Sequence, residues 1–270
     1  MLKFLRTRLQ QGTRTTSFPA VRPRLPERYR GRPAFDPARC GDGEACRGRM
    51  PSDLVQIGPD GQPGLDVGAC LFSPEEAAAC PGGALRYTTD PAMASRTRDG
   101  LRSATGEVAL ATELDRRSRS LFGRSLRLRS VVAGSCGGCE PDLNVLGTVV
   151  FDMARFGIQF VASPRHADGL VITGAVSINM RDALYRTCEA MPDPRLVIAV
   201  GACAINGGPF RGSPEVGDGV PPDLPVDLWI PGCPPHPLTV LDGLLRLLGR
   251  MPETSVADTT PAPPAAGPAS

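Results

Sequence analysis

The sequence has 270 residues, of which 41% are hydrophobic and 21% charged, a balance typical of a soluble globular protein. It has no run of eighteen apolar residues, so no membrane span is predicted, and its 5% aromatic content argues against base stacking on nucleic acid. The net charge of +2 hides a basic front, because residues 1–130 carry 22 Lys and Arg against 14 Asp and Glu. A basic N-terminal half can bind an acidic subunit, an anionic lipid surface or nucleic acid. It can equally be a surface that is only exposed to solvent.

The first part of the chain is predicted to be rich in loops. Residues 1–35 hold nine basic residues, one Glu and four prolines, so we expect a basic extended arm. Residues 36–90 combine four cysteines with many Gly and Pro, which predicts a small loop-rich unit. Residues 91–125 are polar and rich in Arg, and we expect a linker there. Residues 251–270, rich in Pro, Ala and Thr, are predicted to be a disordered tail.

Residues 126–250 alternate apolar, β-branched runs with helical patterns. The runs predicted to be strands are residues 126–134, 157–163, 168–175, 195–202 and 226–232. Between the first two, Leu143, Leu146, Val150 and Met153 repeat at helical spacing, and Gly157 is expected to end that helix. Strands that alternate with helices predict a flavodoxin-like α/β domain with a doubly wound, mostly parallel sheet.

Four cysteines follow the carboxyl ends of predicted strands. Cys136 and Cys139 form a C-G-G-C loop after the first strand, Cys203 follows the fourth and Cys233 the fifth. These ends share one edge of a parallel sheet, so the four thiols are expected to converge. Four thiolates can hold a [4Fe–4S] cluster or zinc, and a single C-x2-C pair favours the cluster. Cys188, on the apolar face of a predicted helix, is expected to be a core residue.

The motifs around these cysteines resemble a known family. GSCGGCEPDLN, SPRHADGLVITGAVS, VIAVGACAINGGPF and IPGCPPHP resemble the small iron–sulfur subunit shared by respiratory complex I, where it is the 20 kDa subunit, and membrane-bound [NiFe] hydrogenases. The resemblance implies that Cys136, Cys139, Cys203 and Cys233 hold one [4Fe–4S] cluster. Complex I members have two adjacent cysteines at the first position, so C-G-G-C is more similar to the formate-hydrogenlyase branch. The family's acidic residue is met by Asp142, with Glu140 as an extra acid.

The front of the chain also resembles a hydrogenase component. GTRTTSFP and YRGRPAFDPARC are similar to the opening of a two-cluster ferredoxin-like subunit, whose repeat reads C-x2-C-x2-C-x3-C-P. The two repeats here read Cys40, Gly43, Cys46, Met50, Pro51 and Cys70, Ser73, Glu76, Cys80, Pro81. Residues 36–90 are therefore expected to be a degenerate two-repeat ferredoxin-like segment, fused to the iron–sulfur domain. One cluster position keeps Cys40, Cys46 and Cys80, which hold a second cluster or none; the other keeps only Cys70 and is expected to be empty.

The resemblance implies an electron-transfer subunit of a hydrogenase-like oxidoreductase complex, without a catalytic site of its own. It would pass electrons through one [4Fe–4S] cluster to or from a [NiFe] site in a large subunit. The alternatives are a complex I-like NADH/quinone oxidoreductase subunit that passes electrons to quinone, and a cluster-free or zinc-bound assembly scaffold. Nine cysteines without a visible export signal favour metal over disulfides and a cytoplasmic location. We expect attachment to the cytoplasmic face of a membrane through partner subunits, and no nucleic acid.

Overall fold

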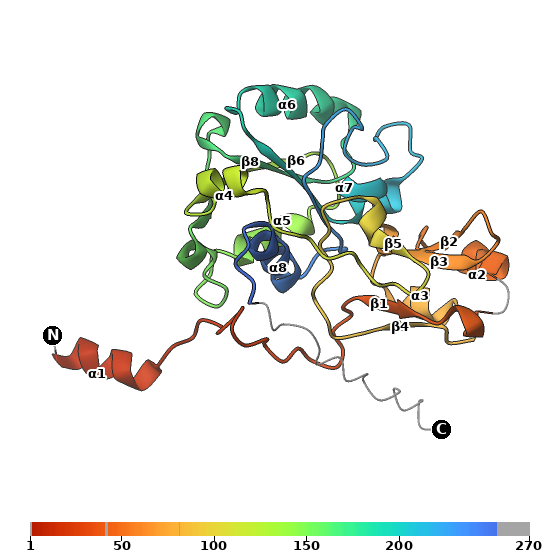
Figure 1. Ribbon diagram of the computed structural model, residues 1–270, viewed down its shortest axis with the longest axis horizontal. Coiled ribbons are helices and arrows are strands. Elements are labelled where there is room, and N and C mark those ends of the chain that lie inside the picture. Colours follow the sequence, from red (N-terminus) through yellow and green to blue (C-terminus); the bar gives the residue numbers. More distant parts are fainter. Residues whose placement is uncertain (1, 41–42, 81, 253–270) are drawn as a thin grey trace.

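The computed structural model describes residues 2–40, 43–80 and 82–252 (Figure 1). Pro81 and, from residue 253 onward, the predicted disordered tail lie outside the described residues. The helices are α1 (Leu2–Gln11), α2 (Gly43–Arg49), α3 (Pro74–Ala78), α4 (Arg116–Phe122), α5 (Cys139–Val145), α6 (Ile178–Glu189), α7 (Ala202–Asn206) and α8 (Pro237–Leu247). None of the helices in these ranges has the continuous apolar length that a membrane span requires.

A five-stranded parallel sheet forms the centre of the C-terminal half. Its strands are β6 (Leu126–Val132), β7 (Ile158–Phe160), β8 (Gly169–Thr173), β9 (Leu196–Val200) and β10 (Leu228–Ile230), and each lies within one of the predicted runs. The order across the sheet is β10-β9-β8-β6-β7. Counted from the first to the fifth strand, this is the 2-1-3-4-5 order of flavodoxin-like folds, so the predicted fold class is confirmed.

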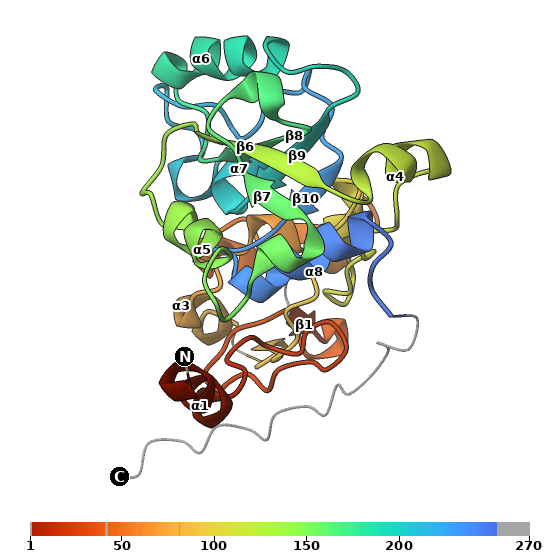
Figure 2. The same cartoon turned by 90° about the vertical axis from the view of Figure 1, so that its left-hand side faces the viewer.

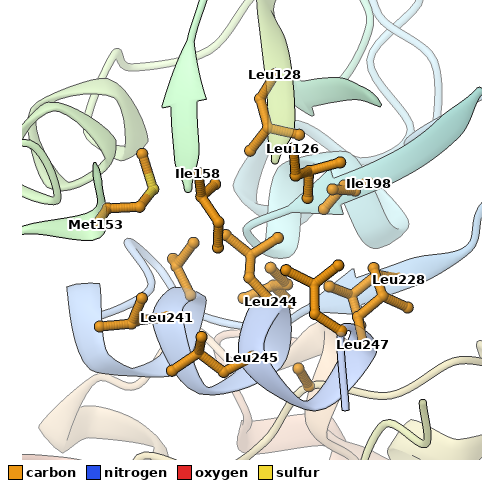
Figure 3. Close-up of a cluster of buried hydrophobic side chains, with 14 of the residues drawn as sticks. Leu126, Leu128, Met153, Ile158, Ile198, Leu228, Leu241, Leu244, Leu245 and Leu247 are labelled. Atoms are coloured by element: carbon orange, nitrogen blue, oxygen red, sulfur yellow. The ribbon is translucent and has the colours of Figure 1, made fainter. Parts of the chain in front are cut away.

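Helices cover both faces of this sheet, which explains why β8 and β9 are buried at every position. On one face α8 packs Leu241, Leu244 and Leu245 against the sheet, in a core that includes Leu126 and Ile198 (Figure 3). On the other face α6 covers Leu170, Ile172 and Val197 (Figure 1). Cys188 lies in this second core and is 4% exposed, as expected of a core residue.

The N-terminal half has two small antiparallel sheets. One pairs β1 (Pro33–Phe35) with β4 (Leu85–Tyr87); the other has the order β2-β3-β5 and consists of β2 (Val55–Ile57), β3 (Pro63–Asp66) and β5 (Arg102–Ser103). A separate core that includes Phe35, Leu54, Leu65 and Leu85 fills the space between them. The likeness of residues 36–90 to a ferredoxin, and the fusion of two subunits, stay predictions.

Two segments contain more regular structure than the sequence suggested. Residues 2–11 of the expected extended arm form α1, because Gly and Pro are absent until Gly12, whose φ of +62° lies just past the helix. The expected linker, residues 91–125, contains α4 and β5, and its Ser95 pairs with Trp229 at the edge of the parallel sheet. This segment is therefore built into both halves. Gly243 of α8 allows close approach, since a Cβ there would lie 2.6 Å from the side chain of Ala94.

Candidate functional site

The carboxyl edge of the parallel sheet carries the four cysteines singled out in the sequence. Cys136 lies in the loop after β6, and Cys139 is the first residue of α5. Cys203 is the second residue of α7, directly after β9, and Cys233 follows β10. The loop after β6 stands at the point where the strand order reverses, which is where open α/β sheets bind ligands.

The four thiols lie close enough to influence one another. Burial, together with the thiols of Cys233 and Cys136, raises the pKa of Cys203 to about 12. Burial also raises the pKa of Cys139, with added contributions from Glu140 and from the other three thiols. Cys139 and Cys203 are buried, whereas Cys136 is exposed. The raised pKa values favour the protonated thiols of Cys139 and Cys203, and a bound metal would favour the thiolates.

Two glycines leave the space beside the buried thiols free. A Cβ at Gly201, where φ is +90°, would lie 2.8 Å from the Cys139 sulfur. A Cβ at Gly208, where φ is +53°, would lie 2.9 Å from the Cys203 sulfur. Both backbone conformations favour glycine, so the close approach and the conformation require the same residue type.

The donor set consists of four thiols, the ligand type that an iron–sulfur cluster uses. Within residues 2–40, 43–80 and 82–252, no three His, Cys, Asp or Glu side chains are placed to hold a single metal ion. A [4Fe–4S] core takes one thiolate at each of four irons, so its ligands are spread around a larger group. Four thiols from three strand ends, with glycine beside two of them, match that requirement.

Glu140 adds a carboxylate to this edge. Its Oε1 accepts a hydrogen bond from the hydroxyl of Thr173, which is fully buried at the end of β8. Its Oε2 is buried and has no hydrogen-bond partner among the residues that the structure describes. Burial raises the pKa of the nearby Asp142. The sequence motifs did not single out Thr173, although its place at the end of a predicted strand was a usable signal.

Three cysteines of the N-terminal half also lie together. Cys40, Cys46 and Cys80 are 6%, 1% and 4% exposed. The sulfur atoms of Cys40 and Cys46 are 3.6 Å apart. Burial, together with the thiols of Cys40 and Cys80, raises the pKa of Cys46 to about 12. The structure thus brings together the three cysteines that the ferredoxin resemblance assigned to one cluster position.

Cys70, the single thiol of the other position, belongs to a buried hydrogen-bond network. Its sulfur lies 3.5 Å from the carboxylate of Glu76, which is itself fully buried. Glu76 accepts hydrogen bonds from the Tyr87 hydroxyl at 2.6 Å, from the Ser52 hydroxyl, and from the backbone N–H groups of Leu71 at 2.9 Å and Ser73 at 3.0 Å. The repeat pattern suggested only a poor cluster ligand at Glu76 and did not reveal this role.

The N-terminal half packs against the loops of the cysteine edge. The short 3-10 helix η2 (Val67–Ala69), which precedes Cys70, contacts α7, and a Cβ at Gly68 would lie 2.8 Å from the side chain of Ile205. An ion pair of 2.5 Å joins Asp53 to Arg211. Glu76 also contributes to the raised pKa of Cys233, after burial and Cys136. The two halves thus meet beside the candidate site (Figure 2).

Comparison with known proteins gives a consistent family. Residues 136–247 match the family model described as NADH ubiquinone oxidoreductase, 20 Kd subunit. A subunit of the NADH-quinone oxidoreductase of Heliobacterium modesticaldum is 45% identical over 114 residues, which are 42% of this chain and 65% of that protein. Formate hydrogenlyase subunit 7 of Escherichia coli is 44% identical over 126 residues, or 47% of this chain and 49% of that protein. The chain thus spans less than two thirds of either relative.

A solved structure, the membrane-bound sulfane sulfur reductase, superposes on 51% of this chain and 76% of its own chain, with 32% identity and a TM-score of 0.44. The probable membrane-bound hydrogenase subunit mbhJ of Pyrococcus furiosus is 37% identical over 140 residues, which cover 52% of this chain and 84% of that protein. Because that relative is matched over most of its length, the chain belongs to the family of the 20 kDa subunit of NADH ubiquinone oxidoreductase, which also includes hydrogenase subunits.

Proposed function

We propose that the chain is an electron-transfer subunit and that Cys136, Cys139, Cys203 and Cys233 hold one [4Fe–4S] cluster. The observation that carries this proposal is the meeting of four thiols from three strand ends at one edge of the sheet. The edge includes the point where the strand order reverses. The relatives are named as subunits of oxidoreductases, which agrees with a role in redox chemistry.

In this proposal, the cysteines and the glycines of the cysteine edge have different roles. A bound cluster would take up and release single electrons, and the four cysteines would be its ligands. Gly201 and Gly208 would let the backbone approach the cluster closely. Burial of Cys139 and Cys203 would keep water from one side, while the exposed Cys136 marks the side on which an electron partner can come near. The chain needs no general acid or base for this transfer.

We further propose that the partner is the large subunit of a hydrogenase-like complex with a [NiFe] site. The C-G-G-C spacing supports this choice, since complex I members have adjacent cysteines at this position. The similarity to a NADH-quinone oxidoreductase subunit supports the alternative, in which the electrons pass to quinone. Either assembly would hold the chain at a membrane, in line with the name of the membrane-bound hydrogenase relative, and we propose that this is the cytoplasmic face.

The metal content of two matched variants tests the cluster proposal. Anaerobically purified protein should contain at least four irons and four sulfides per chain, and Cys203→Ser should lose about four of each. Cys188→Ser is the control, because Cys188 is equally buried but lies in the core under α6. Full iron and normal folding in Cys203→Ser would contradict the ligand assignment. Zinc in place of iron would instead support the zinc-bound scaffold.

We propose Cys40, Cys46 and Cys80 as the thiols of a second cluster. Their common burial and the 3.6 Å between two of the sulfurs support this assignment. The test is the iron content of a variant in which all three are changed to Ser. Iron well above four per chain, falling to four in the variant, is the expected result. Four irons in both proteins would show that the trio is only part of the core.

A further inference from the structure

Helix α1 stands apart from the folded body and exposes apolar side chains. Figures 1 and 2 show it at the end of an extended connection, away from the sheets. Phe4, Leu5 and Leu9 are 73%, 54% and 83% exposed. Exposed apolar residues this close together are uncommon on an isolated helix, and they favour a binding surface.

The helix is amphipathic, with basic residues beside its apolar stripe. At 3.6 residues per turn, Leu5 and Leu9 lie on one face, and Lys3, Thr7 and Gln10 lie on the opposite one. The leucine stripe is flanked on its two sides by arginines 6 and 8. Long basic side chains in such flanking positions can extend to phosphate groups while the stripe inserts into an apolar layer.

The charge of the surrounding segment has one sign only. Residues 1–26 contain six basic residues and no Asp or Glu; the basic residues are Lys3, Arg6, Arg8, Arg14, Arg22 and Arg24. This pattern complements an anionic surface. A nucleic acid would leave the leucine stripe in water, whereas a bilayer with anionic lipids offers phosphate groups above and an apolar layer beneath.

The chain is fixed to the body from Thr16 onward, so α1 is tethered close to it by a short connection. The Thr16 N–H donates to the Val150 carbonyl at 2.9 Å, and the Arg155 guanidinium donates to the carbonyls of Thr16 at 2.8 Å and Phe18 at 2.6 Å. Phe18 is 3% exposed. The neighbouring Val149 and Val150 are 65% and 41% exposed, which adds apolar surface at the anchor.

We propose that α1 lies in the interface of a bilayer that contains anionic lipids, with Leu5 and Leu9 inserted and Arg6 and Arg8 at the phosphate level. The chain would then contact the membrane directly, beyond the attachment through partner subunits described above. This inference does not depend on the cluster, since α1 shares no residue with the cysteine edge.

Sedimentation of the full chain with lipid vesicles tests the proposal. Vesicles of phosphatidylcholine and phosphatidylglycerol in equal parts should carry the protein down, and vesicles of phosphatidylcholine alone should carry much less. The double variant Leu5→Glu/Leu9→Glu should bind at least about tenfold more weakly. Arg6→Gln/Arg8→Gln should weaken binding at low salt and change it little at high salt. Ile178→Glu on α6, where Ile178 is 60% exposed, is the matched control and should bind as the unchanged chain does.

The outcomes separate the lipid surface from other partners. Equal binding to both vesicle types would overturn the electrostatic part, and unchanged binding of Leu5→Glu/Leu9→Glu would overturn the role of α1. No binding to either vesicle type would overturn the proposal and leave an acidic protein as the partner that binds this helix. Iron content measured in the same samples should be the same in all variants, so a failure here is distinct from a failure of the cluster assignment.

Discussion

At the cysteine edge, Gly201 is required for two reasons: its backbone conformation and its short distance from a thiol. Its φ of +90° is costly for any other residue, and its missing side chain leaves room beside the Cys139 sulfur. Gly212 has a similar φ of +74° but open space around it. Substitution at both Gly201 and Gly212 strains the backbone, but only substitution at Gly201 also crowds the Cys139 sulfur. Comparing the two variants therefore distinguishes these effects.

Gly201→Ala should lose about four irons per chain, as Cys203→Ser should, because the new methyl group would lie 2.8 Å from the Cys139 sulfur. Gly212→Ala should keep its iron and lose only about 1 kcal/mol of stability from the strained backbone. Iron analysis together with urea unfolding measures both effects. Equal iron in the two variants would show that the space beside Cys139 is unimportant for the cofactor.

Glu76 stands at a cysteine position of the ferredoxin repeat, where it would be a poor cluster ligand. In this structure it is instead the centre of a buried hydrogen-bond network. Glu76→Gln should lower the free energy of unfolding by about 3 kcal/mol, because four hydrogen-bond donors converge on a carboxylate that is fully buried. The exposed neighbour Glu75→Gln should cost less than about 0.5 kcal/mol. Urea unfolding of both variants is the measurement, and equal stability would show that the network is not important.

Among the elements, α8 is capped at its N-terminus by His236, which also contacts Tyr29 of the N-terminal half. The Nδ1 atom of His236 accepts a hydrogen bond from the Leu238 N–H at 3.1 Å, and its ring meets that of Tyr29 at 5.0 Å. Burial lowers the pKa of His236. Protonation would remove the acceptor and put a charge among aromatic rings.

The sign of the resulting pH dependence follows from that lowered pKa. The stability contributed by His236 is fully present above the pKa of an unfolded histidine, about 6.5, and is lost as the pH falls through the folded-state value. His236→Asn keeps a helix-capping acceptor that does not titrate. Its free energy of unfolding should therefore fall less between pH 7 and pH 5 than that of the unchanged protein. A parallel fall in both would exclude this histidine as the cause.

The elements of the C-terminal half could be predicted because apolar, β-branched runs and glycine positions are local signals. The exception is the helix expected through Leu143, Leu146, Val150 and Met153, since α5 ends at Val145 and a separate 3-10 turn spans Met153–Phe156. Glycine and β-branched residues at 147–150 explain the break. Gly157, with φ +69°, ends this separate turn and not the longer helix that it was expected to end.

Other features depend on contacts that sequence spacing cannot supply. The pairing of Ser95 with Trp229 joins residues more than a hundred positions apart. The hydrogen bond from Thr173 to Glu140 and the packing of Gly68 on Ile205 likewise need the whole fold. The four-cysteine convergence was predictable only because parallel strands share an edge.

On the scale of the whole molecule, the N-terminal half closes one side of the cysteine edge, while α1 stands apart from the folded body (Figure 1). The contact between η2 and α7 and the ion pair between Asp53 and Arg211 hold the halves together. This arrangement would shield the candidate cluster on one side and leave Cys136 exposed on another. A long-range redox role and a membrane contact can then belong to different parts of one chain.

Low-temperature EPR of the anaerobically purified, reduced protein is the sharpest test of the cluster assignment, in the unchanged chain, in Cys203→Ser and in the triple Ser variant of Cys40, Cys46 and Cys80. We predict a [4Fe–4S] signal that persists in the triple variant and disappears in Cys203→Ser. If every signal survives in Cys203→Ser and none survives in the triple variant, the cluster lies in the N-terminal half and the assignment is wrong. No reducible signal in the unchanged chain would contradict the electron-transfer proposal itself.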